Sequence, residues 1–140
     1  MSDLGWNHFE HDADIGLRAC SATREGLFEA MGEALTGVIT DPATVRPEKT
    51  IRVNCEAPDD ALLLVDWLNA LIYEMATRQM LFGRWHVQLR GPTLDAEVSG
   101  EAIDRDRHRP VVEVKGATYT ALSVQRDEQG DWCGQCIVDV

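Results

Sequence analysis

The segment that most constrains the fold is an apolar run that opens at Asp59 and Asp60. Apolar residues recur along it at the three-, four- and seven-residue steps of an α-helix. These positions are Ala61, Leu64, Val65, Leu68, Leu71, Ile72 and Met75. Leu62, Leu63 and Trp67 widen the apolar arc well beyond one face. A helix that is apolar over so wide an arc needs cover on more than one side, so the sequence predicts a central helix.

The remaining surface of this helix is polar. Asp66, Asn69 and Tyr73 follow one another at steps of three and four residues and form a polar stripe. Such stripes more often satisfy neighbouring main-chain groups than perform chemistry. We therefore leave these three residues out of the candidate site.

A second helix is predicted upstream. Thr23 is a suitable N-cap, apolar residues then recur at helical spacing as far as Val38, and Asp41-Pro42 ends the pattern. Gly26 and Gly32 each cost about 1 kcal/mol relative to alanine inside a helix. We expect close packing against a sheet to compensate for them.

Strands account for the rest of the chain. Alternating polar and apolar residues predict two strands within residues 6–21, separated near residues 11–13, and a strand at 50–56. Residues 84–90 and 93–101 read as a hairpin around Gly91-Pro92. The last predicted strands are 111–115, 118–126 and 131–140. The expected fold is therefore a single α+β domain, residues 1–140, with an antiparallel or mixed β-sheet and two α-helices packed on it.

Charge excludes some partners. The chain has 13 basic and 24 acidic residues among 140, a formal net charge of −11. Such a protein repels nucleic-acid phosphates and anionic membrane surfaces, so we expect neither direct nucleic-acid binding nor a membrane partner. The longest apolar run, ALLLV at 61–65, is too short to span a bilayer, and the first residues do not resemble a signal peptide. We expect a soluble, cytoplasmic protein.

Four cysteines are present, and two of them form the segment CGQC at 133–136. Without a secretory signal, reduced thiols are favoured over a disulfide framework. A thioredoxin-like pair needs its first cysteine at a helix N-terminus, whereas CGQCIVDV reads as the final strand. Zinc needs a second pair, but Cys20 and Cys55 stand alone. Thiols that fill space near a sheet are the favoured interpretation.

Acidic residues provide the main candidate site. In HDADIGLRA, residues 11–19, strand alternation places Asp12 and Asp14 on one face. If the terminal strand pairs beside the second strand, Asp14 meets Asp139, and Val140 adds a carbonyl or carboxylate oxygen. Such oxygen ligands suit Ca²⁺, or Mg²⁺ that retains much of its water. In so acidic a chain, solvated acids that bind nothing remain the alternative.

Common catalytic signatures are absent from the sequence. It contains no P-loop, GxSxG, GxGxxG before a helix, or HExxH motif. None of the four histidines, His8, His11, His86 and His108, lies in a recognisable catalytic context. We expect structural or solvated roles for them.

Several segments together resemble one protein family. HDADIGLRA resembles the amino-terminal signature of the archease family, LLLVDWLNALIYE its central helix, and VKGATYTALSV with WCGQCIVDV its carboxy-terminal strands. GEAIDRDRH at 100–108 resembles the family's Gly-Glu-containing segment. The likeness spans nearly the whole chain in the right order. This chain departs from the pattern at Asp12, where threonine is usual, at Gly116, where alanine is common, and at Thr120, where a histidine is expected.

The resemblance implies a role and a site. Archeases are small cytoplasmic cofactors of the RtcB-type RNA ligase, which uses GTP to join tRNA halves and broken RNA. They promote guanylylation of the ligase's active-site histidine and sustain multiple turnover. The family's metal ligands match Asp14 and Asp139, with Val140 as the following oxygen donor. The resemblance thus implies a non-catalytic activator in tRNA splicing and RNA repair, with Ca²⁺ ahead of Mg²⁺ as the cation.

Two alternatives from other classes stay open. The same carboxylates would hold the catalytic cation of a small metal-dependent hydrolase. A chaperone or specificity modulator of a tRNA methyltransferase is a role also proposed for archeases. A ligase activator needs its partner for any effect, whereas a hydrolase turns over substrate alone.

Overall fold

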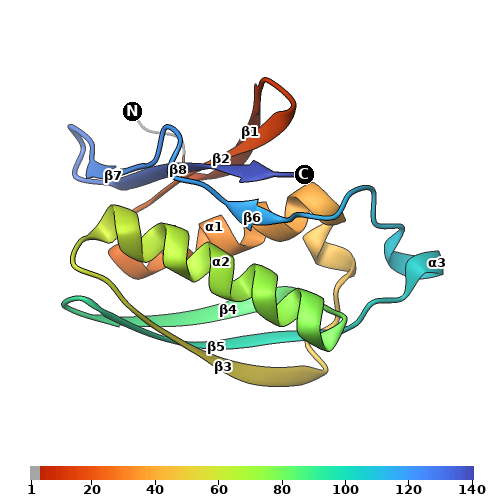
Figure 1. Cartoon of the computed structure of the whole chain (residues 1–140). Helices are drawn as coiled ribbons and strands as arrows, with labels where there is room; N and C mark the ends of the chain where they lie inside the picture. Colours follow the sequence, from red (N-terminus) through yellow and green to blue (C-terminus); the bar gives the residue numbers. More distant parts are fainter. Residues whose placement is uncertain (1–3) are drawn as a thin grey trace.

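The computed structural model describes residues 4–140 and contains eight strands, three α-helices and one 3-10 turn within that range (Figure 1). In chain order the elements are β1 (Gly5–His11), β2 (Asp14–Ser21), α1 (Arg24–Ile39), η1 (Pro42–Thr44), β3 (Lys49–Glu56), α2 (Asp60–Arg78), β4 (Met80–Arg90), β5 (Thr93–Ala102), α3 (Arg105–His108), β6 (Gly116–Ala117), β7 (Ser123–Arg126) and β8 (Trp132–Asp139). No helix in this part of the chain is long and apolar enough to cross a membrane.

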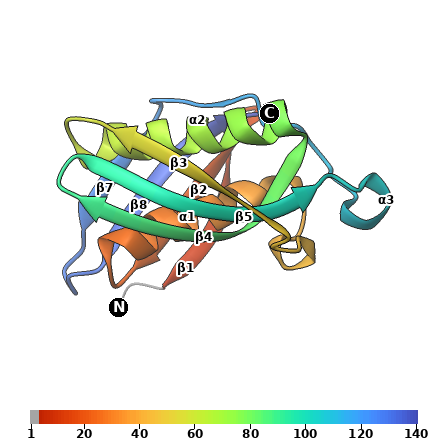
Figure 2. The ribbon, with the colours of Figure 1, turned by 90° about the horizontal axis from the view of Figure 1, so that it is seen from below.

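The strands divide into two antiparallel sheets. One has the order β1-β2-β8-β6, with β7 also paired to β8, and the other has the order β3-β5-β4. The two long helices lie between them, so the molecule has three layers (Figures 1 and 2). The α+β class, the antiparallel pairing and the two packed helices are confirmed. The strands make a sheet on each side of the helices, where the sequence pattern predicts only one.

The central helix is α2. It begins after Asp59, whose side chain accepts a hydrogen bond from the Leu62 amide. Leu64 and Trp67 are fully buried, and the helix contacts β3 on one side and β6 on the other. Two covering sheets explain the wide apolar arc. The Trp67 Nε1–H donates to the Phe28 carbonyl at 2.9 Å, which fastens α2 to α1.

The helix α1 packs between the same two sheets. Thr23 caps it as predicted, accepting a hydrogen bond from the Gly26 amide. A Cβ at Gly32 would lie 2.8 Å from the Trp85 ring on β4, so the absence of a side chain lets helix and sheet approach closely. On the other side, His8 Nε2 donates to the Ala34 carbonyl at 2.8 Å, a structural role for this histidine.

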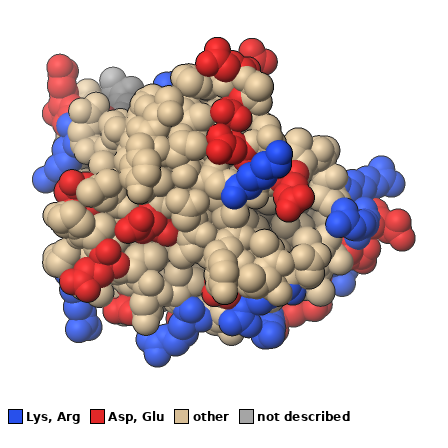
Figure 3. Space-filling view, viewed as in Figure 1, with Lys and Arg blue, Asp and Glu red and all other residues tan. Residues whose placement is uncertain are grey.

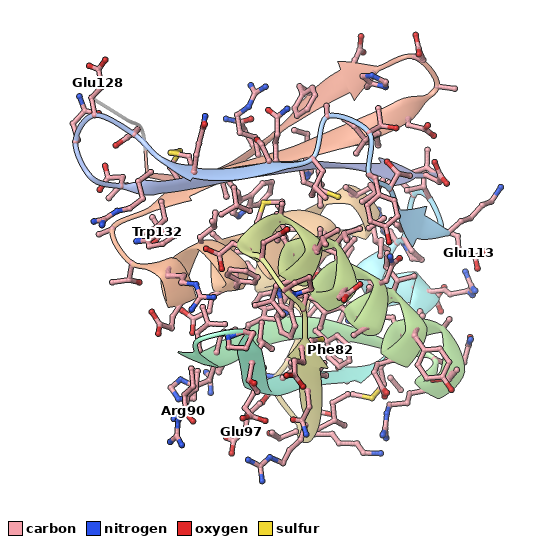
Figure 4. All side chains as sticks on the ribbon, turned by 60° about the vertical axis from the view of Figure 1, so that its left-hand side comes forward. Phe82, Arg90, Glu97, Glu113, Glu128 and Trp132 are labelled. Atoms are coloured by element: carbon pink, nitrogen blue, oxygen red, sulfur yellow. A yellow bond between two sulfur atoms is a disulfide. The ribbon has the colours of Figure 1, made fainter. Side chains whose placement is uncertain are left out.

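In the β3-β5-β4 sheet, the lower sheet of Figure 1, buried and exposed side chains lie on opposite faces. Phe82 lies between the sheet and the helices, whereas Arg90 and Glu97 project from the opposite face (Figure 4). Phe82 is 1% exposed and Glu97 is exposed, as strand alternation requires. The outward face of this sheet is therefore polar.

Two predicted strands are shorter or absent. Residues 111–115 form no strand: the Val111 amide donates to Ile39 O of α1, and only the Lys115 amide reaches a strand, at Asp139 O of β8. Within residues 118–126 only Ser123–Arg126 is a strand. Upstream, β4 starts at Met80, four residues before the prediction.

A buried polar network holds the segment after β5. Glu101, 6% exposed, accepts hydrogen bonds from the Arg46 amide at 2.7 Å, from His108 Nε2 at 3.0 Å and from Arg107. The Asp104 amide donates to His108 Nδ1 at 2.9 Å, which fixes the tautomer. Burial acts to raise the pKa of Glu101, but these hydrogen bonds and the Arg107 charge lower it to about 2.

The expectation of four reduced thiols is wrong for two cysteines. Cys20 and Cys133 occupy opposite positions of β2 and β8 and form a disulfide, with Cα atoms 4.1 Å apart. Within CGQC, the two cysteines are three residues apart and so point to opposite faces of β8. Cys136 is buried, and burial raises the pKa of its thiol to about 11 against the opposing hydrogen bond to Thr118 O. The CGQC segment is therefore not a redox pair.

Candidate functional site

The two predicted acids, Asp14 and Asp139, lie at the same end of the β1-β2-β8-β6 sheet, the upper sheet of Figure 1. Strand β8 pairs with β2 as the prediction required, and Ile15 is opposite Val138. Asp14 on β2 and Asp139 on β8 are the next residues outward, so these two acids occupy adjacent positions across the two strands. The structure thus brings together two residues that are 125 positions apart in the sequence.

Both acids point away from the helices. Leu17 and Cys136 face each other across β2 and β8 and are fully buried in the core. Asp14 and Asp139 lie three residues further along their strands, so alternation turns them to the outer face. Asp14 is half-buried and Asp139 is exposed. Acidic side chains gather at this side of the molecule, over the β1–β2 turn and the end of β8 (Figure 3).

The two carboxylates are not committed to other contacts. Within residues 4–140, neither Asp14 nor Asp139 accepts a side-chain hydrogen bond or forms an ion pair. The main chain at this point is fixed, because the Lys115 amide donates to Asp139 O at 2.9 Å. Val140 packs its side chain partly against the core. The site therefore combines a hydrogen-bonded main chain at Asp139 with free carboxylate oxygens.

Asp12 does not share this face. It lies in the two-residue turn between β1 and β2, is exposed, and has a left-handed φ of 53°. The expectation that Asp12 and Asp14 sit side by side on a strand is wrong, because the chain reverses at Asp12 and Ala13. Aspartate tolerates this conformation better than most residues, which gives Asp12 a conformational role in the turn.

Sequence reasoning missed two neighbours of the acids. His11 pairs with Asp14 across the hairpin, and Gly116 pairs with Asp139, so four strands contribute to one row. The sequence could have predicted the pairing of His11 with Asp14, because a two-residue hairpin turn places its flanking residues opposite each other. The Gly116 pairing depends on a short strand that no local pattern marks.

The surroundings of the row are well packed. A Cβ at Gly16 would lie 2.2 Å from the Phe9 ring, so that ring covers the strand at Gly16. The Arg18 guanidinium lies 4.4 Å from the Phe9 ring centroid and donates to Gln135 at 3.2 Å. Such contacts hold β1, β2 and β8 in register beneath the acids.

The donor set bears on the expected cation. Among the described residues, no group of three His, Cys, Asp or Glu side chains is arranged to hold a metal ion. The two carboxylates, and the Val140 main-chain oxygen expected from the sequence, are all hard oxygen donors. Oxygen donors of this kind fit Ca²⁺ or Mg²⁺. Further ligands have to come from water or from a partner.

Comparison with known proteins identifies the family. The model of the archease protein family matches residues 6–140. The chain belongs to the archease family. Protein archease from Thermococcus gammatolerans is 33% identical over 139 residues, covering 96% of this chain and 98% of its own length. Protein archease from Methanopyrus kandleri is 34% identical over 141 residues, covering 98% of this chain and 100% of its own.

Solved archease structures share the fold. The solution structure of protein 1598 from Methanobacterium thermoautotrophicum superposes with a TM-score of 0.79 at 27% identity, covering 97% of this chain and 99% of its own. The crystal structure of an archease from Thermotoga maritima, described as a possible chaperone, gives 0.59 at 17% identity and covers 94% of each chain. The second likeness concerns the fold alone.

Proposed function

We propose that this protein is a non-catalytic accessory factor that activates an RtcB-type, GTP-dependent RNA ligase. It promotes guanylylation of the ligase and sustains multiple turnover in tRNA splicing and RNA repair. Membership of the archease family supports this role. The observation that carries it is that Asp14 and Asp139 lie at adjacent positions, one residue beyond the paired Ile15 and Val138, with carboxylates that no other residue of the described chain engages.

The proposed site holds a divalent cation, Ca²⁺ ahead of Mg²⁺. Asp14 and Asp139 supply carboxylate oxygens, and Val140 supplies a main-chain oxygen. A bound cation would supply positive charge that attracts and polarises phosphate oxygens. The disulfide between Cys20 and Cys133 and the packing around Phe9 keep the two strands aligned, so the acids need no rearrangement.

Charge gives a physical route to activation. With a net charge of −11, the protein is drawn to a basic nucleotide- and RNA-binding cleft and is repelled by free RNA. Docking then favours the ligase conformation that is competent for nucleotide transfer. This requires that the protein bind that conformation more tightly than the resting one.

Ligation assays with matched variants test the proposal. Asp14→Asn and Asp139→Asn each remove one charge from the row, and Asp12→Asn removes the same charge from the adjacent turn. Under multiple turnover with the ligase, GTP and divalent metal, the first two variants should lose acceleration and the third should retain it. Equal acceleration by all three folded variants would refute a role for the acid pair.

A chaperone role is the second candidate, favoured by the description of the Thermotoga maritima archease as a possible chaperone. In this form the protein assists or redirects a tRNA methyltransferase. Affinity capture from cell extract separates the two candidates by the partner recovered. Recovery of a methyltransferase without the ligase would replace the first proposal, and phosphoester turnover by the protein alone, lost in Asp14→Asn, would indicate a hydrolase.

A further inference from the structure

We propose that a second surface, which meets the acid pair only where the Lys115 amide donates to Asp139 O, binds an extended peptide segment of a partner protein. The surface is a pocket of about 340 Å³ beside the segment 110–115, here called the strap. The strap runs from α3 to β6 past the C-terminal end of α1 (Figure 1). This proposal does not depend on the ligase role or on a cation.

The pocket lies between the strap and the last turns of α2. Its apolar walls are made by Ile72, Met75 and Ala76 of α2 and by Val111, Val112 and Val114 of the strap. Its volume falls at the lower end of the range of about 300–1,000 Å³ for ligand sites. Val111 is 76% exposed, a large apolar side chain left in solvent at the rim. The pocket thus has the composition of a site that takes apolar side chains.

The strap has the form of an unpaired edge strand. Val112 and Val114 turn inward while Val111 and Glu113 are exposed, which is the alternation of an extended chain. Along residues 4–140, the N–H and C=O groups of Val112 and Val114 find no hydrogen-bond partner. The Val111 and Lys115 amides donate to Ile39 O and Asp139 O, so the protein occupies one edge of the strap. Along an extended chain, the main-chain groups of successive residues point to opposite edges. The N–H and C=O groups of Val112 and Val114 therefore point to the other edge of the strap, which is open.

An open strand edge beside an apolar wall on a helix favours a peptide over other occupants. An added strand would satisfy the main-chain groups of Val112 and Val114 and place alternate side chains in the pocket. A fatty acid would fill the apolar space but leave those groups unpaired. For comparison, the edge of β6 is already closed, because Asn69 of α2 both donates to and accepts from the main chain of Ala117.

Charge defines the peptide further. Arg105 lines the pocket, and its guanidinium forms no ion pair or side-chain hydrogen bond with any described residue. Glu113 also borders the pocket and would repel a strongly acidic partner. The expected segment therefore has apolar residues at alternate positions and a single carboxylate at one end, which pairs with Arg105.

Labelled synthetic octapeptides provide the probe. Six peptides alternate threonine with valine, isoleucine or leucine and have aspartate at the first or the last position. At least one should bind with a Kd below about 1 mM, the weak end of measurable affinity. Binding should shift the amide NMR signals of Val112 and Val114 and slow their hydrogen exchange. The same peptide with alternate amides N-methylated should lose binding, because it cannot form the strand ladder.

Variants locate the contact. Ala76→Trp fills the pocket from an exposed position of α2 and should weaken binding by about tenfold or more, a loss of roughly 1.4 kcal/mol. Thr77→Trp places the same ring on the neighbouring exposed position outside the lining and should bind normally. Arg105→Gln should weaken the binding of peptides that have aspartate and should leave the binding of amidated, uncharged peptides unchanged.

Clear outcomes would overturn this inference. They are no binding by any of the six peptides at about 1 mM, shifts confined to residues outside the strap, or equal effects of Ala76→Trp and Thr77→Trp. Binding of dodecanoate at the pocket without any peptide binding would assign the site to a fatty ligand instead. Asp14→Asn should leave peptide binding unchanged, so failure here and failure of the ligase proposal are distinguishable.

Discussion

Glu101 carries a prediction whose size follows from its contacts. Its side chain is 6% exposed and accepts hydrogen bonds from the Arg46 amide, Arg107 and His108. In Glu101→Ala, these donors lose their acceptor at a buried position. An unsatisfied buried donor costs about 1–3 kcal/mol, and breaking a buried charged pair costs about 3–5 kcal/mol. We expect Glu101→Ala to lose about 3–5 kcal/mol of unfolding free energy.

Urea denaturation followed by circular dichroism measures this loss. The control is Glu97→Ala, an exposed acid on the same strand, β5, which should change stability by no more than about 0.5 kcal/mol. A loss in Glu101→Ala below about 1 kcal/mol would show that the network contributes little and would refute the reasoning.

The same carboxyl group predicts a pH dependence. Its pKa is lowered on folding from the ordinary 4.5 to about 2, so the folded state binds this proton more weakly than the unfolded state. The stabilisation is therefore present above about pH 4.5 and is lost as the pH falls towards 2. Glu101→Gln has no proton to gain, so its stability should fall less over this range. Parallel curves for the two proteins would contradict the assignment.

Three further predictions concern packing and cross-linking. Trp67→Phe removes the buried hydrogen bond to Phe28 O and leaves a small cavity, and should lose about 2–3 kcal/mol in denaturant titration; no loss would show that this link between α1 and α2 is unimportant. Gly100→Ala places a Cβ 1.8 Å from Leu81 O, main chain that cannot swing aside, and should lose about 1–3 kcal/mol or fail to fold; an unchanged melting temperature would contradict the close strand approach. Reducing the disulfide between Cys20 and Cys133 should lower stability by about 2–4 kcal/mol, measured as a melting shift with dithiothreitol that is absent in Cys20→Ser; identical melting with and without reductant would count against the cross-link.

The sequence predicted a helix or strand well where its formation depends only on residues close together in the chain. The apolar arc of α2 and the Thr23 cap of α1 depend on neighbours within a few residues, and both are found as predicted. The division into two sheets was beyond such patterns. Alternation at β3 shows that one face is buried, but it does not show that the strand pairs with β5 and not with β2. Pairing is decided by contacts far apart in the chain.

The candidate site shows the same division. Placing Asp14 beside Asp139 required one correct guess about long-range pairing, between β2 and β8. The same register joins Cys20 to Cys133 in a disulfide, whereas the sequence, without a recognisable secretory signal, favoured reduced thiols. For the strap, the alternation of valines predicted a strand, and the structure contains none there. The alternation could not reveal that the Val111 amide donates to Ile39 O of α1, and that only the Lys115 amide reaches a strand, at Asp139 O of β8.

The central claim is that the acid pair of Asp14 and Asp139 carries activation of the ligase. The most direct test is the single-turnover rate of ligase guanylylation, measured with labelled GTP in the presence of wild-type protein, Asp14→Asn or Asp12→Asn. We predict acceleration by the wild type and by Asp12→Asn, and none by folded Asp14→Asn. Acceleration by Asp14→Asn equal to that of the wild type, or none by the wild type, would contradict the claim.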